Sequence, residues 1–147
     1  MAKAGVDYIG VTTPFYCNDG NGNFLFHKRS CNCRDEQGSW DLGSGQLEYD
    51  LTAEENVLKE VMEEYGCNGE IQGRLPAHDI FRDNNGVKTH WVAMPFFVKV
   101  DPKEVKINDP DKIDEIGWFR LANMPRPLHT GFSFTYKNFR DYFKEYE

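Results

Sequence analysis

The sequence predicts a mixed α/β domain in which strands and two helices interleave without a regular β-α-β alternation. Runs rich in β-branched and aromatic residues recur along the chain, as in strands. Helical periodicity is confined to residues 53–65 and 134–146, and Gly- and Asn-rich turns separate the other runs. A doubly wound parallel sheet would need a helix after nearly every strand, so the prediction is a mixed sheet.

The first half of the chain holds four short runs of strand character. They are residues 8–17, 24–28, 40–42 and 46–49. Residues 18–23 are dense in Asn, Asp and Gly, which tolerate positive φ, so they predict a hairpin turn. Residues 30–39 are polar and predict a loop, and Gly43-Ser44-Gly45 predicts a turn before the last run.

The helix at residues 53–65 has signals at both ends. Thr52 and Glu55 have the spacing of a capping box. Gly66 stands where a glycine commonly ends a helix. Apolar residues recur between them at helical spacing, namely Val57, Leu58, Val61, Met62 and Tyr65.

The second half of the chain is expected to contain three strands and the C-terminal helix. The strands are residues 70–81, 88–100 and 116–121. Asn85-Gly86 predicts a hairpin between the first two, and Pro76 predicts an edge or a bulge. Residues 101–111 are charged and predict a loop. Aromatic residues at spacings of one, three and four predict an amphipathic helix over residues 134–146.

Composition limits the class of protein. A chain of 147 residues with 39% hydrophobic and 14% aromatic residues fits one domain, residues 1–147, with a real core. The net charge of -7 and the lack of a basic stripe argue against a stable nucleic-acid partner. No apolar run is long enough for a membrane span, and no secretory signal is visible, so we expect a cytoplasmic protein.

Four cysteines allow two interpretations. Cys31-Asn-Cys33 with His27 nearby suggests a zinc site, but the spacing differs from that of zinc knuckles and no second pair follows. The preferred interpretation is reduced thiols without a disulfide framework.

Glu60, Glu63 and Glu64 form the most informative cluster. Their i, i+3 and i+4 spacing places the three carboxylates on one helix face. Unit charges about 5 Å apart repel by about 3 kcal/mol per pair at an effective dielectric near 20. On an exposed face, water and salt remove most of this cost, and a solvated acidic face is the plainer interpretation. In a cleft, the carboxylates would have raised pKa values or would bind a cation such as Mg²⁺ or Mn²⁺.

The surrounding segment resembles the Nudix box, G-x5-E-x7-R-E-U-x-E-E-x-G-U, where U is a bulky apolar residue. Gly45 matches the first glycine, Lys59-Glu60-Val61 matches R-E-U, Glu63-Glu64 matches the E-E pair and Gly66-Cys67 matches the end. The runs 24–29, 40–45 and 113–121 are also similar to strands and turns of that family. The resemblance implies a Nudix-like α/β/α sandwich with a mixed, curved sheet.

Three positions depart from the family pattern. Leu51 stands in place of the first glutamate, Lys59 in place of the arginine, and Ser44 in place of a glycine. Lysine keeps the charge of arginine but loses its two-pronged donor geometry. Glu48, Asp50 and Glu54 are the acidic residues close enough in sequence to substitute for the missing glutamate.

The resemblance also implies roles for individual residues. The implied catalytic residues are Glu60, Glu63 and Lys59. The implied metal ligands are Glu60, Glu63, Glu64 and the Ser44 carbonyl. The implied substrate contacts are Arg29 and Gly45. The implied cofactor is Mg²⁺ or Mn²⁺. The general base stays open between Glu60 and Glu63.

Residues outside this segment carry weaker expectations. Asp114 and Glu115 are candidates for a late acidic group. Aromatic residues that could stack a base are interpreted as core residues, namely Trp91, Phe96 and Phe97. Three histidines are interpreted as packed or exposed residues without a role, namely His78, His90 and His129.

The resemblance implies a pyrophosphohydrolase that cleaves a nucleoside diphosphate linked to another group, such as a nucleoside triphosphate or ADP-ribose. The alternative is a Nudix-fold module that binds nucleotides with weak or no catalysis. Two further hypotheses are an isoprenoid diphosphate isomerase and a plain acidic interaction domain. The expected partner is a small nucleotide-type molecule, and a homodimer is expected only because homodimers are common.

Overall fold

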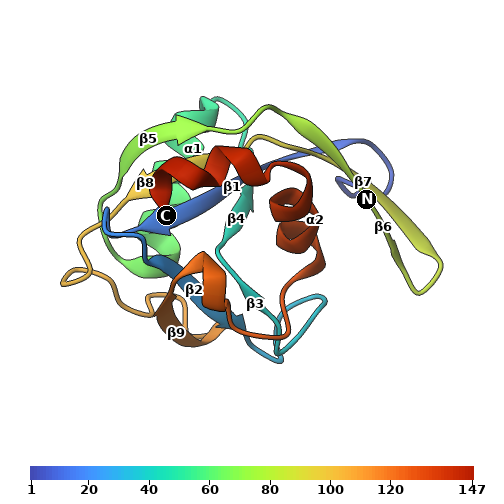
Figure 1. Cartoon of the computed structure of the whole chain (residues 1–147). Coiled ribbons are helices and arrows are strands. Elements are labelled where there is room, and N and C mark those ends of the chain that lie inside the picture. Colours follow the sequence, from blue (N-terminus) through green and yellow to red (C-terminus); the bar gives the residue numbers. More distant parts are fainter.

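The computed structural model describes residues 1–147 as a mixed sheet between two helices (Figure 1). The strands are β1 (Gly10–Asn18), β2 (Phe24–Arg29), β3 (Trp40–Asp41), β4 (Ser44–Gln46), β5 (Glu70–Arg74), β6 (His78–Asn84), β7 (Val87–Ala93), β8 (Phe96–Lys99) and β9 (Ile113–Phe119). The helices are α1 (Ala53–Tyr65) and α2 (Thr130–Asn138), with 3-10 turns η1 (Leu121–Asn123) and η2 (Arg140–Tyr146). The predicted mixed α/β class is confirmed.

Strand β1 is the centre of the sheet. It pairs in parallel with β7 along its first half and with β8 along its second half. On its other edge it pairs antiparallel with β4 and, at its end, with β2. The remaining antiparallel pairs are β2 with β3, β2 with β9, β5 with β8 and β6 with β7. Strand β1 therefore joins the two halves of a curved sheet.

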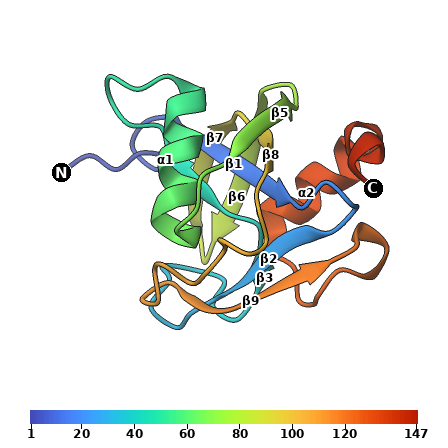
Figure 2. The same cartoon turned by 90° about the vertical axis from the view of Figure 1, so that its left-hand side faces the viewer.

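Two apolar layers cover the two faces of this sheet, and α1 and α2 lie on opposite sides of it (Figure 2). Alternation along β1 places Phe15 and Cys17 in the layer under α1, whereas Tyr16 between them belongs to the layer with Phe132 of α2. Both faces of the sheet are therefore covered at the second half of β1.

The structure divides two of the predicted strands. The run 70–81 forms β5 and β6, and the run 88–100 forms β7 and β8. Pro76 and Pro95 lie in the two breaks, where proline cannot donate a ladder hydrogen bond. The divided strands let β5–β8 stay with the body of the sheet while β6–β7 extends as a hairpin, seen at the right of Figure 1.

Other boundaries also differ from the predictions. The strand expected at 46–49 is wrong beyond Gln46, because the Glu48 amide donates to Asn56 Oδ1 at 3.1 Å instead of continuing the ladder. The single helix expected at 134–146 is two segments, α2 and η2, because Phe139 between them has φ of -124°. Strand β9 begins three residues before the predicted run 116–121.

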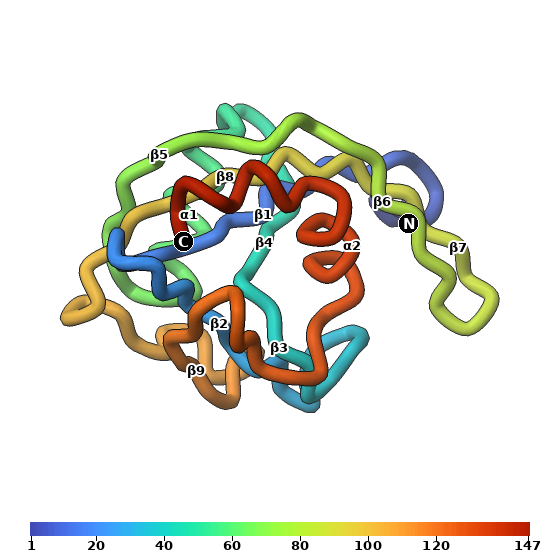
Figure 3. Tube along the Cα trace, viewed as in Figure 1, coloured from blue at the N-terminus to red at the C-terminus, as the bar shows by residue number.

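The N-terminal segment lies beside the β6–β7 hairpin, as the tube in Figure 3 shows. The His90 amide donates to the Gly5 carbonyl at 2.8 Å, which fixes this segment against β7. No helix of the structure combines the length and the apolar character that a membrane crossing requires.

Candidate metal and diphosphate site

Helix α1 presents the carboxylate cluster. The predicted capping box is present at Thr52 and Glu55, and Gly66 adopts φ of 65° as the left-handed cap. Val57, Val61 and Tyr65, on the adjacent side of the helix, are buried in the core. Because both ends and the buried face are fixed, the direction in which Glu60 and Glu64 project is fixed as well.

Strand β4 runs directly against these glutamates. A Cβ added to Gly45 would lie 2.3 Å from Cδ of Glu60, and one added to Gly43 would lie 3.0 Å from Oε2 of Glu64. Glycine at these two positions is therefore what lets the backbone reach the carboxylates.

The ladder between β1 and β4 sets the direction of the Ser44 carbonyl. The Phe15 amide donates to the Gly43 carbonyl at 3.1 Å, and the Thr12 hydroxyl donates to the Gly45 carbonyl at 3.2 Å. Peptide groups alternate in direction along an antiparallel strand, so the Ser44 carbonyl between them points away from β1. It is left free to accept a ligand on the side of the cavity.

The carboxylate of Glu64 lies in an environment that disfavours its negative charge. Part of the residue is exposed, but its Oε2 is buried and has no hydrogen-bond partner. Burial raises the pKa of Glu64 well above its usual value, and the nearby carboxylates of Glu60, Asp41 and Asp109 raise it further. Burial, followed by the charge of Glu63, also raises the pKa of Glu60.

These observations fit a divalent cation. A buried carboxylate oxygen without a partner, a second carboxylate and a free carbonyl are hard oxygen donors that suit Mg²⁺ or Mn²⁺. The positive charge would also relieve the repulsion that raises the two pKa values. The ligand roles of these residues remain a prediction of the sequence.

Lys59 lies outside the cavity and pairs with two carboxylates. Its Nζ is 2.7 Å from Oε2 of Glu48 and 2.6 Å from Oε1 of Glu63. These hydrogen bonds raise the pKa of Lys59, and the bond to Glu48 has the larger effect. Leu51 has no part in this network, and Glu54 pairs with Arg74 instead. Of the three acidic residues considered in the sequence, Glu48 is thus the one that contacts the lysine.

Replacing Glu48 by glutamine is expected to weaken Mn²⁺ binding only about two- to fivefold, because the Lys59 pairs are exposed and such pairs contribute little. Titration of Mn²⁺ into the variant and the wild type measures this. Leu51→Glu should leave the Mn²⁺ affinity unchanged, since Lys59 already pairs with Glu48 and Glu63. A large gain in Mn²⁺ affinity for Leu51→Glu would show that Glu48 does not replace the missing glutamate.

Tyr65 ties helix α1 to the turn that carries Ser44. Its hydroxyl donates to the Leu42 carbonyl at 2.7 Å and lies 2.6 Å from Nδ1 of His27, which therefore donates to it. All three residues are buried. Burial lowers the pKa of His27 to about 4, so the ring is neutral at pH 7.

Tyr65→Phe leaves the Leu42 carbonyl and the His27 N–H without partners. Each unpaired buried group costs about 1–3 kcal/mol, so we expect the free energy of unfolding to fall by about 2–6 kcal/mol. Urea unfolding followed by circular dichroism measures this. A change below about 0.5 kcal/mol would mean that the hydroxyl does not hold the turn.

The carboxylates line a cavity of about 600 Å³ between α1, the β6–β7 hairpin and α2. Only 5 of its 26 lining residues are hydrophobic, so it suits a polar molecule. Four sequence-predicted residues besides Glu60 and Glu64 line it, namely Arg29, Ser44, Gly45 and Glu63. Lys59 does not line the cavity, and neither do Asp114 and Glu115, which are exposed. The acidic residue from the later part of the chain that does line the cavity is Asp109.

Two further expectations need correction. Phe96 and Phe97 are buried in the core as interpreted, but Trp91 lines the cavity. His129, interpreted as a residue without a role, also lines the cavity and caps α2 by accepting from the Gly131 amide. Both side chains reach the wall because β7 and α2 border the cavity, which no local pattern reveals.

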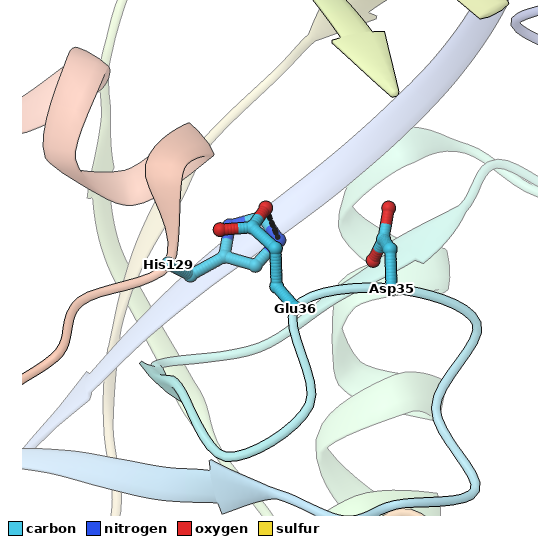
Figure 4. Close-up of side chains that lie close together, drawn as sticks. All are labelled: Asp35, Glu36 and His129. Atoms are coloured by element: carbon cyan, nitrogen blue, oxygen red, sulfur yellow. Dashed lines mark ion pairs between the residues drawn. The ribbon is translucent and has the colours of Figure 1, made fainter. Parts of the chain in front are cut away.

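The loop between β2 and β3 supplies a second acidic group, Asp35 and Glu36, next to His129 (Figure 4). The three ligand atoms lie within 4.8 Å of one another, close enough to hold a cation. However, Arg29 and Arg82 each lie 2.9 Å from an oxygen of Asp35, and Arg82 also contacts Glu36. Nε2 of His129 also lies 3.0 Å from Oε2 of Glu36. Two arginines already neutralise these carboxylates, so Glu60 and Glu64 form the better cation site.

Comparisons with known proteins give a family and similar folds. The model of the NUDIX domain family matches residues 9–142. A MutT NUDIX hydrolase from Burkholderia pseudomallei has a TM-score of 0.75 and 27% identity, over 87% of this chain and 95% of that one. A MutT protein from Methanosarcina mazei has a TM-score of 0.70 and 24% identity, over 94% and 92%.

One curated relative is similar over a shorter stretch. MutT4 of Mycobacterium tuberculosis is 26% identical over 89 residues, which is 60% of this chain. The match spans 36% of MutT4, so the chain corresponds to about a third of that protein.

Proposed function

The chain belongs to the NUDIX family, whose hydrolases act on diphosphate bonds, and from this premise we propose that it is a Mg²⁺- or Mn²⁺-dependent pyrophosphohydrolase. Its proposed substrate is a nucleoside diphosphate linked to another group, such as a nucleoside triphosphate or ADP-ribose. The observation that carries this proposal is the buried, unpartnered Oε2 of Glu64 beside Glu60 and the Ser44 carbonyl. A carboxylate there has a cost that a cation removes.

In this proposal Glu60, Glu64 and the Ser44 carbonyl hold the cation, with Glu63 as a further ligand at the exposed edge. When bound, the cation neutralises the diphosphate and lowers the pKa of a water. Gly45 allows the close approach of the backbone to Glu60, and Arg29 lies in the same wall as a contact for phosphate oxygens. Lys59 acts as a positioning residue, because it contacts Glu63 from outside the cavity.

A proton must leave the attacking water, and two carboxylates are proposed to accept it. Glu60 lines the cavity, and neither oxygen of its carboxylate pairs with a lysine or an arginine. Glu63 also lines the cavity, but one of its oxygens is engaged by Lys59. This difference favours Glu60 over Glu63 as the base.

The experiment measures the release of phosphate or pyrophosphate with Mg²⁺ or Mn²⁺. Its panel contains nucleoside triphosphates, ADP-ribose, dinucleotide polyphosphates and nucleotide sugars. Turnover that requires the cation supports the proposal and identifies the leaving group. Nucleotide binding without turnover of any compound would favour the alternative, a binding module with weak or no catalysis. Leu51 and Lys59, which depart from the family pattern, are the reason to test this alternative.

A further inference from the structure

Asp41, the second residue of β3, is a buried residue in the cavity wall. Its Oδ1 accepts from the Leu42 amide at 2.8 Å, which fixes the direction of the carboxylate. Its Oδ2 accepts no hydrogen bond from the protein. The guanidinium of Arg29 pairs with this oxygen only at 3.9 Å, which is too long for a hydrogen bond. One oxygen of a fixed carboxylate therefore keeps its acceptor capacity for a ligand.

This free oxygen is open to the cavity. The Asp41 side chain is 13% exposed. Among the side chains that are not exposed, Oε2 of Glu64 is the only unpaired polar atom that is completely buried. Oδ2 of Asp41 is also unpaired, so it is not completely buried. Because Asp41 lines the cavity, a ligand in the cavity can reach this oxygen.

Asp41 differs from the acidic loop in having no donor for this oxygen. Each oxygen of Asp35 accepts from an arginine at 2.9 Å. Burial would raise the pKa of Asp41, but neighbouring positive charges, of which His129 contributes most, hold it below its usual value. Asp41 is therefore ionised at pH 7. An ionised oxygen in a largely buried place is unfavourable until an N–H group donates to it.

An aromatic surface lies next to Asp41. The His129 amide donates to the Trp40 carbonyl at 2.8 Å, so β3 lies against the start of α2. Tyr16 and Phe132 line this part of the cavity, and their ring centroids are 5.5 Å apart. Burial raises the pKa of Tyr16, and the charge of Asp41 raises it further. A carboxylate beside aromatic rings suits a flat ligand with a donor on its edge, such as a nucleobase.

We propose that Asp41 is a specificity-determining residue that accepts a hydrogen bond from an exocyclic amine on the base of the substrate. This inference rests on the proposed function, since it assumes that the diphosphate lies at Glu60 and Glu64. The Cα atoms of Asp41 and Ser44 are at most about 11 Å apart, because three residues of extended chain reach no further. A base attached to the bound diphosphate can therefore reach Asp41.

Cytosine, adenine and guanine each carry an exocyclic amine, whereas an oxo group at the same place is an acceptor. An oxo group would face Oδ2 with no proton between the two oxygens. Three pairs of ligands isolate the amine of each base, namely CDP with UDP, GDP with IDP, and ADP with purine riboside 5′-diphosphate. Dissociation constants are measured by titration calorimetry with Ca²⁺ in place of Mg²⁺, so that binding is observed whether or not the compound is hydrolysed.

We expect the wild type to bind the amine-bearing member of at least one pair about tenfold or more tightly, because hydrogen bonds to charged groups are among the strongest. Asp41→Asn keeps the shape of the side chain and can still accept from the Leu42 amide, but it presents an N–H₂ group in place of Oδ2. It should therefore reduce the preference to less than about threefold. Asp101→Asn is the matched control, because Asp101 also accepts from a backbone amide but lies outside the cavity.

Titration with Mn²⁺ separates this role from cation binding, and Asp41→Asn should bind Mn²⁺ nearly as tightly as the wild type. A large loss of Mn²⁺ affinity, with equal weakening of all six compounds, would mean that Asp41 is a cation ligand and would overturn the proposal. So would a wild type that discriminates within no pair, or a preference that survives in Asp41→Asn. A preference that depends on Asp41 without turnover of any compound would support this role and contradict the proposed hydrolysis.

Discussion

Glu64→Gln is expected to reduce kcat with Mg²⁺ by at least about a hundredfold. The substitution keeps the shape of the side chain but removes the charge from the one buried oxygen that has no protein partner. Initial rates over a range of Mg²⁺ concentrations measure the effect, and excess Mg²⁺ should not restore the rate.

The control for this variant lies on the same helix. Glu54→Gln makes the same chemical change at an exposed position that pairs with Arg74, outside the cavity, and should keep the wild-type rate. Equal rates for Glu64→Gln and wild type would remove Glu64 from the proposed site.

Metal-free stability distinguishes lost function from lost folding. The raised pKa of Glu64 means that the folded state binds more protons than the unfolded state above the usual carboxylate pKa. The free energy of unfolding of the wild type, with chelator present, should therefore fall as pH rises through the raised pKa of the folded state. Glu64→Gln should lack this contribution and unfold at the same or a higher temperature than the wild type at pH 8.

Gly45→Ala is expected to lower Mn²⁺ affinity and kcat/KM by about ten- to a hundredfold while the fold persists. The added Cβ would lie 2.3 Å from Cδ and 2.4 Å from Cγ of Glu60. The Glu60 side chain can rotate away at low cost, so the strand stays in place and the carboxylate moves. Manganese titration and thermal unfolding of the same sample separate these two effects.

Gly38→Ala is a useful comparison because an added Cβ there meets nothing within 4 Å. Gly38 has φ of 81°, so this variant should lose some stability but keep its Mn²⁺ affinity. The opposite pattern, in which Gly45→Ala binds Mn²⁺ like the wild type, would show that β4 does not position Glu60.

Local signals explain why α1 could be predicted to its boundaries. The capping box, the apolar repeat and the terminal glycine all lie within the 15 residues from Thr52 to Gly66. The structure confirms both ends of the helix. It buries Val57, Val61 and Tyr65 of the apolar repeat, whereas Leu58 and Met62 are exposed. The strands were less predictable, because Pro76 and Pro95 divide runs that otherwise have continuous strand character. Helical periodicity near the C-terminus also failed to reveal the break at Phe139.

Apart from Arg29 of β2, the predicted residues that line the cavity lie on the side that α1 and β4 supply. Glu60, Glu63, Glu64, Ser44 and Gly45 lie in one short segment and meet in the structure. The wall formed by Asp35, Glu36 and Arg82 was not predicted, because its contacts span long distances in sequence. Arg82 and Glu36 are 46 residues apart, and Thr130 and Glu36 are 94 apart. In the sequence, Asp35 and Glu36 are ordinary residues of a polar loop.

In the proposed site the glutamates of α1, and not the acidic loop, hold the cation. Crystals of the protein soaked in Mn²⁺, with diffraction data collected at the manganese absorption edge, test it most directly. We expect an anomalous peak in contact with Glu60, Glu64 and the Ser44 carbonyl. A peak at Asp35, Glu36 and His129 instead, or no peak near Glu64 at saturating Mn²⁺, would contradict it.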